Sequence, residues 1–160
     1  MSFRAIRYHD ISCGHRVHNH ESKCRHLHGH NYRVHFVCEG FLDEIGRVMD
    51  FSVIKERLCM WLEENWDHKF LAWDQDPVMQ TIVVGTMESP FPGADVASIH
   101  LTQSVVWVPF NPTAENMAEY LVMVVGPQQL ANTGVTLVEA TVDETRKCSA
   151  SYTLPQGLRP

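Results

Sequence analysis

The stretch that decides the fold is HGHNYRVHFVCEG, residues 28–40. Side chains alternate between the two faces of a β-strand, so the even-numbered residues of this stretch share one face. That face carries two histidines followed by aromatic, apolar and thiol side chains: His28, His30, Tyr32, Val34, Phe36 and Cys38. The pattern predicts a strand that ends at Gly40 and presents two imidazoles on one side.

The segment before this strand predicts its partner. Residues 3–17 also read as extended, and the loop HNHESKCRHL, residues 18–27, would join the two strands as an antiparallel hairpin. Eight of the ten histidines fall in the first quarter of the chain. The hairpin would therefore place two histidine-bearing segments side by side.

A change of hydrophobic period after the hairpin predicts an amphipathic helix. Apolar residues recur at i, i+4, i+7 and i+8, in Ile54, Leu58, Trp61 and Leu62. Asp50 or Ser52 is the expected N-cap, since a short polar side chain can accept a bond from the first free N–H groups.

The C-terminal third predicts one more helix and two more strands. The helix lies in NPTAENMAEYLVMVVGP, residues 111–127, where Thr113 can cap it and Gly126-Pro127 is expected to stop it. Apolar and polar residues then alternate in GVTLVEATVDETRKCSASYTL, residues 134–154, which predicts strand structure broken near Arg146-Lys147.

Residues 73–110, between the two helices, are long for a plain connection and are expected to be an insertion. They contain ESPFPGAD, a loop by its Pro and Gly content, and SVVWVPF, a short strand. The order of elements predicts an α+β fold in which the helices cover one face of an antiparallel sheet. We expect residues 1–160 to form a single domain.

Composition limits the class of function. The formal net charge is −6 and basic residues are scattered, so we expect a small-molecule partner and no nucleic acid. The sequence has no 18-residue apolar run and no signal-peptide pattern, which predicts a cytoplasmic protein without a membrane span. Five cysteines without paired spacing argue against a disulfide framework.

His28 and His30, with Gly29 between them, would direct two nitrogens towards one metal ion. A catalytic zinc needs three protein ligands and an open fourth position. We select His15 as the third ligand, because SCGHRV places it near the end of the partner strand after small residues. The alternative third ligand is one of the other histidines of this region: His18, His20, His26 and His35.

Four further residues carry possible chemistry. Cys24 reads as a fourth ligand of a closed zinc site, as a base beside an open one, or as an inert small residue. Asp67 and His68, in WDHKFL, supply a carboxylate and an imidazole for proton transfer, or form a solvated helix end. Glu144 shares the parity of an apolar strand face, so it is either exposed where the strand ends or bound to N–H groups of a ligand.

Six motifs in this order resemble the 6-pyruvoyl-tetrahydropterin synthase and 6-carboxy-tetrahydropterin synthase family. They are SCGHRV, CRHLHGHNY, MDFSVIKERL, WDHKFL, NPTAENMA and VDETRKCSASY, and they are distributed along almost the whole chain except residues 73–110. The resemblance implies a tunnelling fold, in which a four-stranded antiparallel sheet with two helices on one face joins other sheets around a barrel. Members typically form hexamers of two trimers, with active sites at subunit interfaces.

The resemblance also implies roles for individual residues. Three histidines would bind zinc: His15, His28 and His30. Cys24 would be the catalytic proton acceptor, assisted by Asp67 and His68. Glu144 would anchor the pterin substrate, and the backbone near Thr113 would help to grip it.

Two reactions occur within this family. The pyruvoyl enzymes eliminate triphosphate from 7,8-dihydroneopterin triphosphate, whereas the carboxy enzymes of queuosine biosynthesis also break a carbon–carbon bond and release acetaldehyde. The three residues between Cys24 and His28 resemble the carboxy type, since the pyruvoyl type usually has five. We therefore expect a 6-carboxy-tetrahydropterin synthase; a zinc-stabilised binding protein, closed by Cys24, is the non-enzymatic alternative.

Overall fold

The computed structural model describes residues 2–88 and 93–159. The strands form one six-stranded sheet with the order β4-β3-β1-β2-β5-β6. The strands are β1 (Phe3–His15), β2 (His28–Gly40), β3 (Phe70–Trp73), β4 (Val105–Val108), β5 (Thr136–Asp143) and β6 (Ser149–Thr153). The predicted four-stranded antiparallel sheet is confirmed as β1, β2, β5 and β6. The two short strands β3 and β4 extend it in parallel at the β1 edge, an extension that the sequence did not predict.

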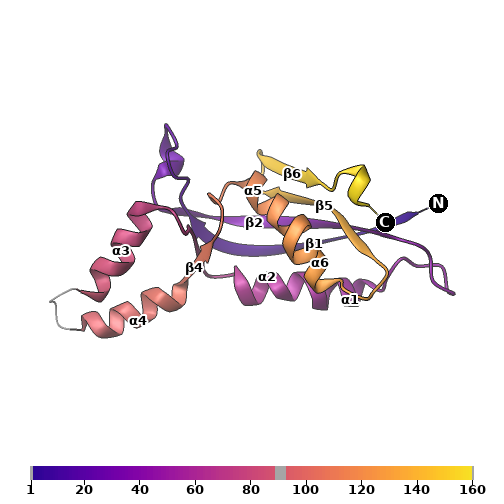
Figure 1. The fold of residues 1–160 in the computed structure, drawn as a ribbon, viewed down its shortest axis with the longest axis horizontal. Coiled ribbons are helices and arrows are strands. Elements are labelled where there is room, and N and C mark those ends of the chain that lie inside the picture. Colours follow the sequence, from indigo (N-terminus) through magenta and orange to yellow (C-terminus); the bar gives the residue numbers. More distant parts are fainter. Residues whose placement is uncertain (1, 89–92, 160) are drawn as a thin grey trace.

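The predicted hairpin of β1 and β2 runs along the length of the molecule (Figure 1). Its register pairs His15 with His28 and Gly14 with Gly29. A Cβ added at Gly29 would lie 2.9 Å from the carbonyl oxygen of Cys13, closer than real side chains approach. The absence of a side chain at Gly29 therefore lets the two histidine-bearing strands lie close together.

The first predicted helix is confirmed as α1 (Phe51–Ile54), the π turn η2 (Lys55–Cys59) and α2 (Met60–Asn65). Asp50 caps it by accepting a hydrogen bond from the Ser52 N–H. Leu58 and Leu62 are fully buried against the sheet, so the amphipathic pattern correctly identified the inner face of this helix.

The second helix comprises α5 (Ala114–Tyr120), the π turn η3 (Leu121–Val125) and α6 (Gly126–Gln129), with Thr113 as the N-cap. The predicted stop at Gly126-Pro127 is wrong. A proline inside an α-helix loses a backbone bond and clashes with the preceding turn. Here the Gly126 N–H bonds back to Leu121 O in the wider π turn, so Pro127 falls in the first turn of α6, where its missing N–H is tolerated.

Both helices cover the same face of the sheet and enclose the main core (Figure 1). The other face is open, and Ile6 and Tyr8 of β1 are exposed on it. On that face Arg33 pairs with Asp10, with Nε 2.7 Å from Oδ1, and its guanidinium lies 4.2 Å from the centre of the Tyr8 ring. The fold therefore has a covered, apolar face and an open, largely polar face.

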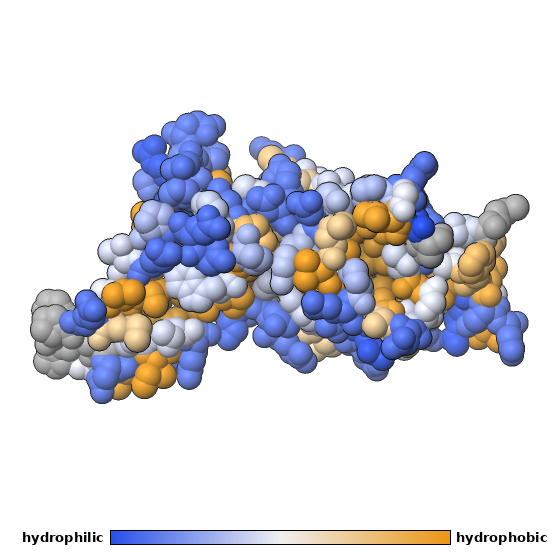
Figure 2. Space-filling model, in the orientation of Figure 1, coloured by the Kyte–Doolittle hydropathy of each residue, from blue (hydrophilic) through white to orange (hydrophobic). Residues whose placement is uncertain are grey.

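The stretch between β3 and β4 forms two helices, α3 (Pro77–Met87) and α4 (Ala94–Ser104), which the sequence did not predict. The predicted strand SVVWVPF is confirmed as β4, and the predicted loop ESPFPGAD lies partly outside the described residues. Figure 1 shows α3 and α4 at one end of the molecule, opposite the two chain termini. Apolar residues are exposed on these helices (Figure 2): Val84, Met87, Val96 and Ile99.

The division of the chain into one domain with an insertion at 73–110 stays a prediction. Within residues 2–88 and 93–159, every helix is too short or too polar to cross a membrane.

Candidate metal centre

Three histidines and one glutamate converge at the end of the β1–β2 hairpin. His28 and His30 are the first and third residues of β2, His15 is the last residue of β1, and Glu144 comes from the turn after β5. One nitrogen or oxygen atom of each of these four side chains lies within 4.8 Å of the others. The structure thus brings together the three histidines chosen from the sequence, and it adds Glu144 to them.

The distances in this group suit a small metal ion. Glu144 Oε1 lies 3.0 Å from His30 Nε2 and 3.5 Å from His15 Nε2. Ligand atoms placed tetrahedrally around zinc, at its usual bond lengths, are about 3.3 Å apart. Nitrogen and carboxylate oxygen are donors that zinc accepts, so the residues present fit this metal.

Two backbone carbonyls orient the imidazoles. His15 Nδ1 lies 2.7 Å from the carbonyl oxygen of Pro112, and His28 Nδ1 lies 2.8 Å from that of His26. A carbonyl only accepts, so each Nδ1 must carry the hydrogen, which leaves the lone pair of Nε2 free for a metal. This is the arrangement expected of metal-binding histidines.

Burial favours the neutral form of two of these imidazoles, those of His15 and His30. His15 is 1% exposed, and loss of solvation lowers its pKa despite the opposing bond to Pro112. Burial also lowers the pKa of His30, against the attraction of Glu144. Although Glu144 lies close to both rings, the Nε2 atoms of His15 and His30 have no hydrogen-bond partner among the described residues. Neutral histidines with free, inward-facing nitrogens are prepared to bind a cation.

Cys24 lies in the short helical turn η1 (Lys23–Arg25) and is half-buried. It does not belong to the converging donor group among the described residues, so the structure gives no support to Cys24 as a fourth ligand. Its carbonyl oxygen accepts a hydrogen bond of 2.8 Å from the Val17 N–H, which ties the turn to the segment just after His15.

Asp67 and His68 form a hydrogen-bonded pair on the open face of the sheet. Asp67 accepts from the Ser12 N–H at 2.8 Å and from His68 Nδ1 at 2.6 Å. Burial raises the pKa of Asp67, but these two bonds outweigh it and the net pKa is lowered. The pair lines a pocket of about 700 Å³ together with Arg33 and Arg146.

The pair faces outward. The His68 side chain is 83% exposed, whereas that of His15 is 1% exposed on the covered side. His68 also holds a left-handed backbone conformation, with φ of 55°, which turns the chain sharply between α2 and β3. The imidazole of His68 is therefore available to a molecule that approaches the open face.

The 6-pyruvoyl tetrahydropterin synthase family model matches residues 5–155. The chain belongs to this family. Curated relatives carry the name 6-carboxy-5,6,7,8-tetrahydropterin synthase. The protein from Rickettsia bellii is 30% identical over 140 residues, covering 87% of this chain and 91% of the relative. A second, from Halobacterium salinarum and named as probable, is 32% identical over 102 residues, covering 59% of this chain and 64% of the relative.

Solved structures agree with the tunnelling fold of this tetrahydropterin synthase family. An uncharacterised protein from Wolinella succinogenes superposes with a TM-score of 0.80 at 23% identity, covering 96% of this chain and 98% of that one. The 6-pyruvoyl tetrahydropterin synthase of Caenorhabditis elegans superposes with a TM-score of 0.62 at 22% identity, covering 96% of both chains. At these identities the likeness shows the fold alone.

Several contacts of this tetrahydropterin synthase family member were not predicted from its sequence. The backbone carbonyls of Pro112 and His26 carry no side-chain signal. Thr113, expected near the pterin, caps α5 by accepting from the Asn116 N–H and directly follows the carbonyl that orients His15. The segment at Pro112 thereby joins the second helix to the candidate metal centre.

Proposed function

We propose that this protein is a zinc-dependent 6-carboxy-5,6,7,8-tetrahydropterin synthase. It would convert 7,8-dihydroneopterin triphosphate and one water molecule to 6-carboxy-5,6,7,8-tetrahydropterin, acetaldehyde and triphosphate, a step of queuosine biosynthesis. The observation that carries this proposal is the convergence of His15, His28 and His30 with Glu144. The names of the curated relatives support the carboxy product over the pyruvoyl one.

The three histidines would hold zinc, with the carbonyls of Pro112 and His26 fixing the rings of His15 and His28. Zinc would act as a Lewis acid towards the hydroxyl oxygens of the substrate side chain. Glu144 lies at the edge of this centre, and its two carboxylate oxygens can accept from neighbouring N–H groups of a pterin ring. The backbone at Thr113 would support the ring from the α5 side.

Cys24 would accept the proton from the substrate, with Asp67 and His68 completing the proton path. Within one chain the pair faces the open side of the sheet, while the histidine centre belongs to the covered side. We therefore propose that the Asp67-His68 pair of one subunit serves the site of a neighbour in a hexamer of two trimers. The high exposure of His68 supports this arrangement.

The test is to incubate zinc-loaded protein with 7,8-dihydroneopterin triphosphate and to identify the products by mass. We expect the carboxylated tetrahydropterin together with acetaldehyde. A pyruvoyl product would move the protein to the other reaction of the family, and an unchanged substrate would refute both enzymatic assignments.

A second candidate follows from Glu144 Oε1, which lies where a fourth tetrahedral ligand would lie. A centre closed by Glu144 would make a zinc-stabilised binding protein without turnover. Glu144→Gln and Cys24→Ala separate the two. In the enzyme both variants keep zinc and lose turnover, whereas in a closed centre Glu144→Gln loses zinc and Cys24→Ala changes nothing.

A further inference from the structure

Arg16 is a buried cation that touches two segments of the chain. It follows His15 directly and is 8% exposed. Its Nε donates to the carbonyl oxygen of Arg25 at 2.8 Å, and its Nη1 pairs with both carboxylate oxygens of Asp76. The guanidinium thus connects the residue after Cys24 with the start of the insertion.

Asp76 is placed to hold this cation. It is 1% exposed and is the N-cap of α3, where it accepts from the Val78 N–H at 3.0 Å. Its own backbone N–H donates to the Trp73 carbonyl at 3.0 Å. His18 lies next to the pair, with Nδ1 3.6 Å from Asp76 Oδ1. Asp76 is therefore the anionic partner of Arg16, and its capping and backbone hydrogen bonds hold it in place.

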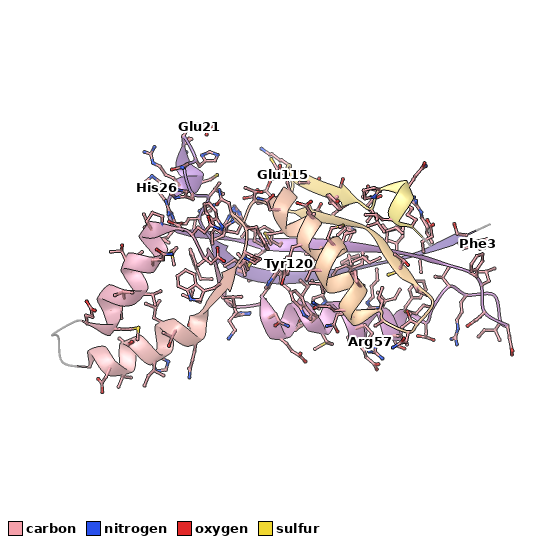
Figure 3. The ribbon with its side chains drawn as sticks, in the orientation of Figure 1. Phe3, Glu21, His26, Arg57, Glu115 and Tyr120 are labelled. Carbon is pink, nitrogen blue, oxygen red and sulfur yellow. The ribbon has the colours of Figure 1, made fainter. Side chains whose placement is uncertain are left out.

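The Cys24 turn is bound through two successive carbonyls. The Val17 N–H donates to the Cys24 carbonyl and Arg16 donates to the Arg25 carbonyl, so both bonds come from residues just after His15. Figure 3 shows Glu21 and His26 on the loop that carries this turn, at the same end of the molecule as α3. Figure 2 shows this loop as a hydrophilic projection.

The beginning of the loop has a separate support. Asn111 accepts from the His18 N–H at 2.8 Å and donates to the His18 carbonyl at 3.0 Å. If the Arg16–Asp76 pair were lost, Asn111 would still hold the backbone of His18. The course of the chain from His15 to His18 would therefore stay the same. The segment that would be released is the turn containing Cys24.

We propose that Arg16 and Asp76 are positioning residues for Cys24. The insertion supplies Asp76, Asp76 fixes the guanidinium of Arg16, and Arg16 fixes the turn through the Arg25 carbonyl. Charge-assisted hydrogen bonds hold the guanidinium and the carboxylate in a defined geometry. Loss of either partner would leave the other as an uncompensated buried charge. The placement of Cys24 follows from contacts alone, while its consequence for turnover rests on the proposed function.

The test compares Asp76→Asn with Asp74→Asn in the full-length, zinc-loaded protein. Asparagine keeps the N-cap acceptor at position 76 but removes the charge that holds Arg16. Asp74 is an exposed carboxylate two residues earlier, so its replacement is a matched control for charge. Arg16→Lys is the second variant; it keeps the charge but not the forked geometry needed to reach both partners.

Cys24 alkylation by iodoacetamide reports the turn directly. Cys148 is exposed and serves as the internal reference in the same sample, while Cys13, Cys38 and Cys59 are buried. In Asp76→Asn we expect the rate of Cys24 relative to Cys148 to rise about threefold or more, as the turn is released. Zinc content should equal that of the wild type, with kcat about tenfold lower or more and KM within about twofold, because a displaced reacting group mainly lowers kcat.

The proposal is overturned if the relative alkylation rate of Cys24 is the same in wild type, Asp76→Asn and Arg16→Lys. It is also overturned if both variants lose zinc in proportion to activity, since the pair would then support the metal centre instead of the turn. Should Asp76→Asn fail to fold, Arg16→Lys decides the same question. If the wild type consumes no pterin substrate, the proposed function fails, while the alkylation comparison still decides whether the pair positions Cys24.

Discussion

His15 Nδ1 lies 2.7 Å from the carbonyl oxygen of Pro112, a residue 97 positions further along the chain. This contact fixes the tautomer of the most buried imidazole of the centre and ties it to the start of α5. The candidate metal centre is therefore built into the junction between the hairpin and the second helix. Its geometry depends on the fold as a whole.

Removal of one histidine of the candidate centre should weaken metal binding strongly. We expect His28→Ala to weaken zinc affinity by about 100-fold or more, beyond the usual effect of losing an outer hydrogen-bond partner. The matched control is His26→Ala, because His26 supports His28 through its backbone carbonyl and not through its side chain. Zinc content measured after dialysis checks this. Equal zinc in His28→Ala and the wild type would remove His28 from the ligand set.

Close approach of β1 and β2 should make position 29 intolerant of a side chain. A Cβ at Gly29 would meet the Cys13 carbonyl oxygen at 2.9 Å, so Gly29→Ala should lower the free energy of unfolding by about 1–3 kcal/mol. Gly85→Ala is the control, since its Cβ would meet nothing within 4 Å and it lies in α3. That change should stabilise the protein by about 0.5–1 kcal/mol. Denaturant unfolding of the two variants measures the difference, and equal stabilities would contradict the strand geometry.

The sequence predicted the parts of this protein that depend on local periodicity. Alternation in residues 28–40 and the apolar spacing from Ile54 to Leu62 correctly identified β2 and the first helix. The π turn before Pro127 was not predictable, because it depends on a backbone bond between Gly126 and Leu121 that no residue type specifies. The two helices of the insertion were not predicted, because their apolar residues lie on both the packed and the exposed sides of each helix and show no amphipathic period.

The candidate site shows the same division. Parity of side chains on a strand placed His28 and His30 together, and strand pairing brought His15 to them. Glu144 reaches the centre from the turn after β5, and strand parity indicated its direction but not its partners. The contacts of Arg16 were invisible in the sequence, because its buried partner Asp76 is 60 residues away.

Subunits should complement one another if His68 serves a neighbouring site. Cys24→Ala and His68→Ala are each expected to be inactive alone. Mixed oligomers, formed by joint refolding, should regain about a quarter of the wild-type activity. In random assembly about one site in four combines an intact Cys24 with an intact His68 from the neighbouring subunit. Activity of mixed samples against separately assembled ones checks this prediction. If mixing restores nothing, Cys24 and His68 must act within one chain.

Acid should remove the contribution of Asp67 to stability. Its folded-state pKa is lowered, on balance, by the bonds from the Ser12 N–H and His68. The contribution is therefore fully present above about pH 4, the ordinary range of an aspartate, and is lost as the pH falls through the lower folded-state pKa. Asp67→Asn should be about 1–2 kcal/mol less stable than the wild type at pH 7, with the gap narrowing at pH 3. A gap that stays constant between these pH values would contradict the assigned bonds.

The central claim is that the histidine centre carries the chemistry of a 6-carboxy-tetrahydropterin synthase. Its most direct test is the amount of acetaldehyde released from 7,8-dihydroneopterin triphosphate, measured beside the zinc content of the wild type and of Cys24→Ala. The account predicts acetaldehyde in step with the carboxylated pterin for the wild type, and none for Cys24→Ala at equal zinc. A wild type that holds zinc but releases no acetaldehyde from this substrate would contradict it.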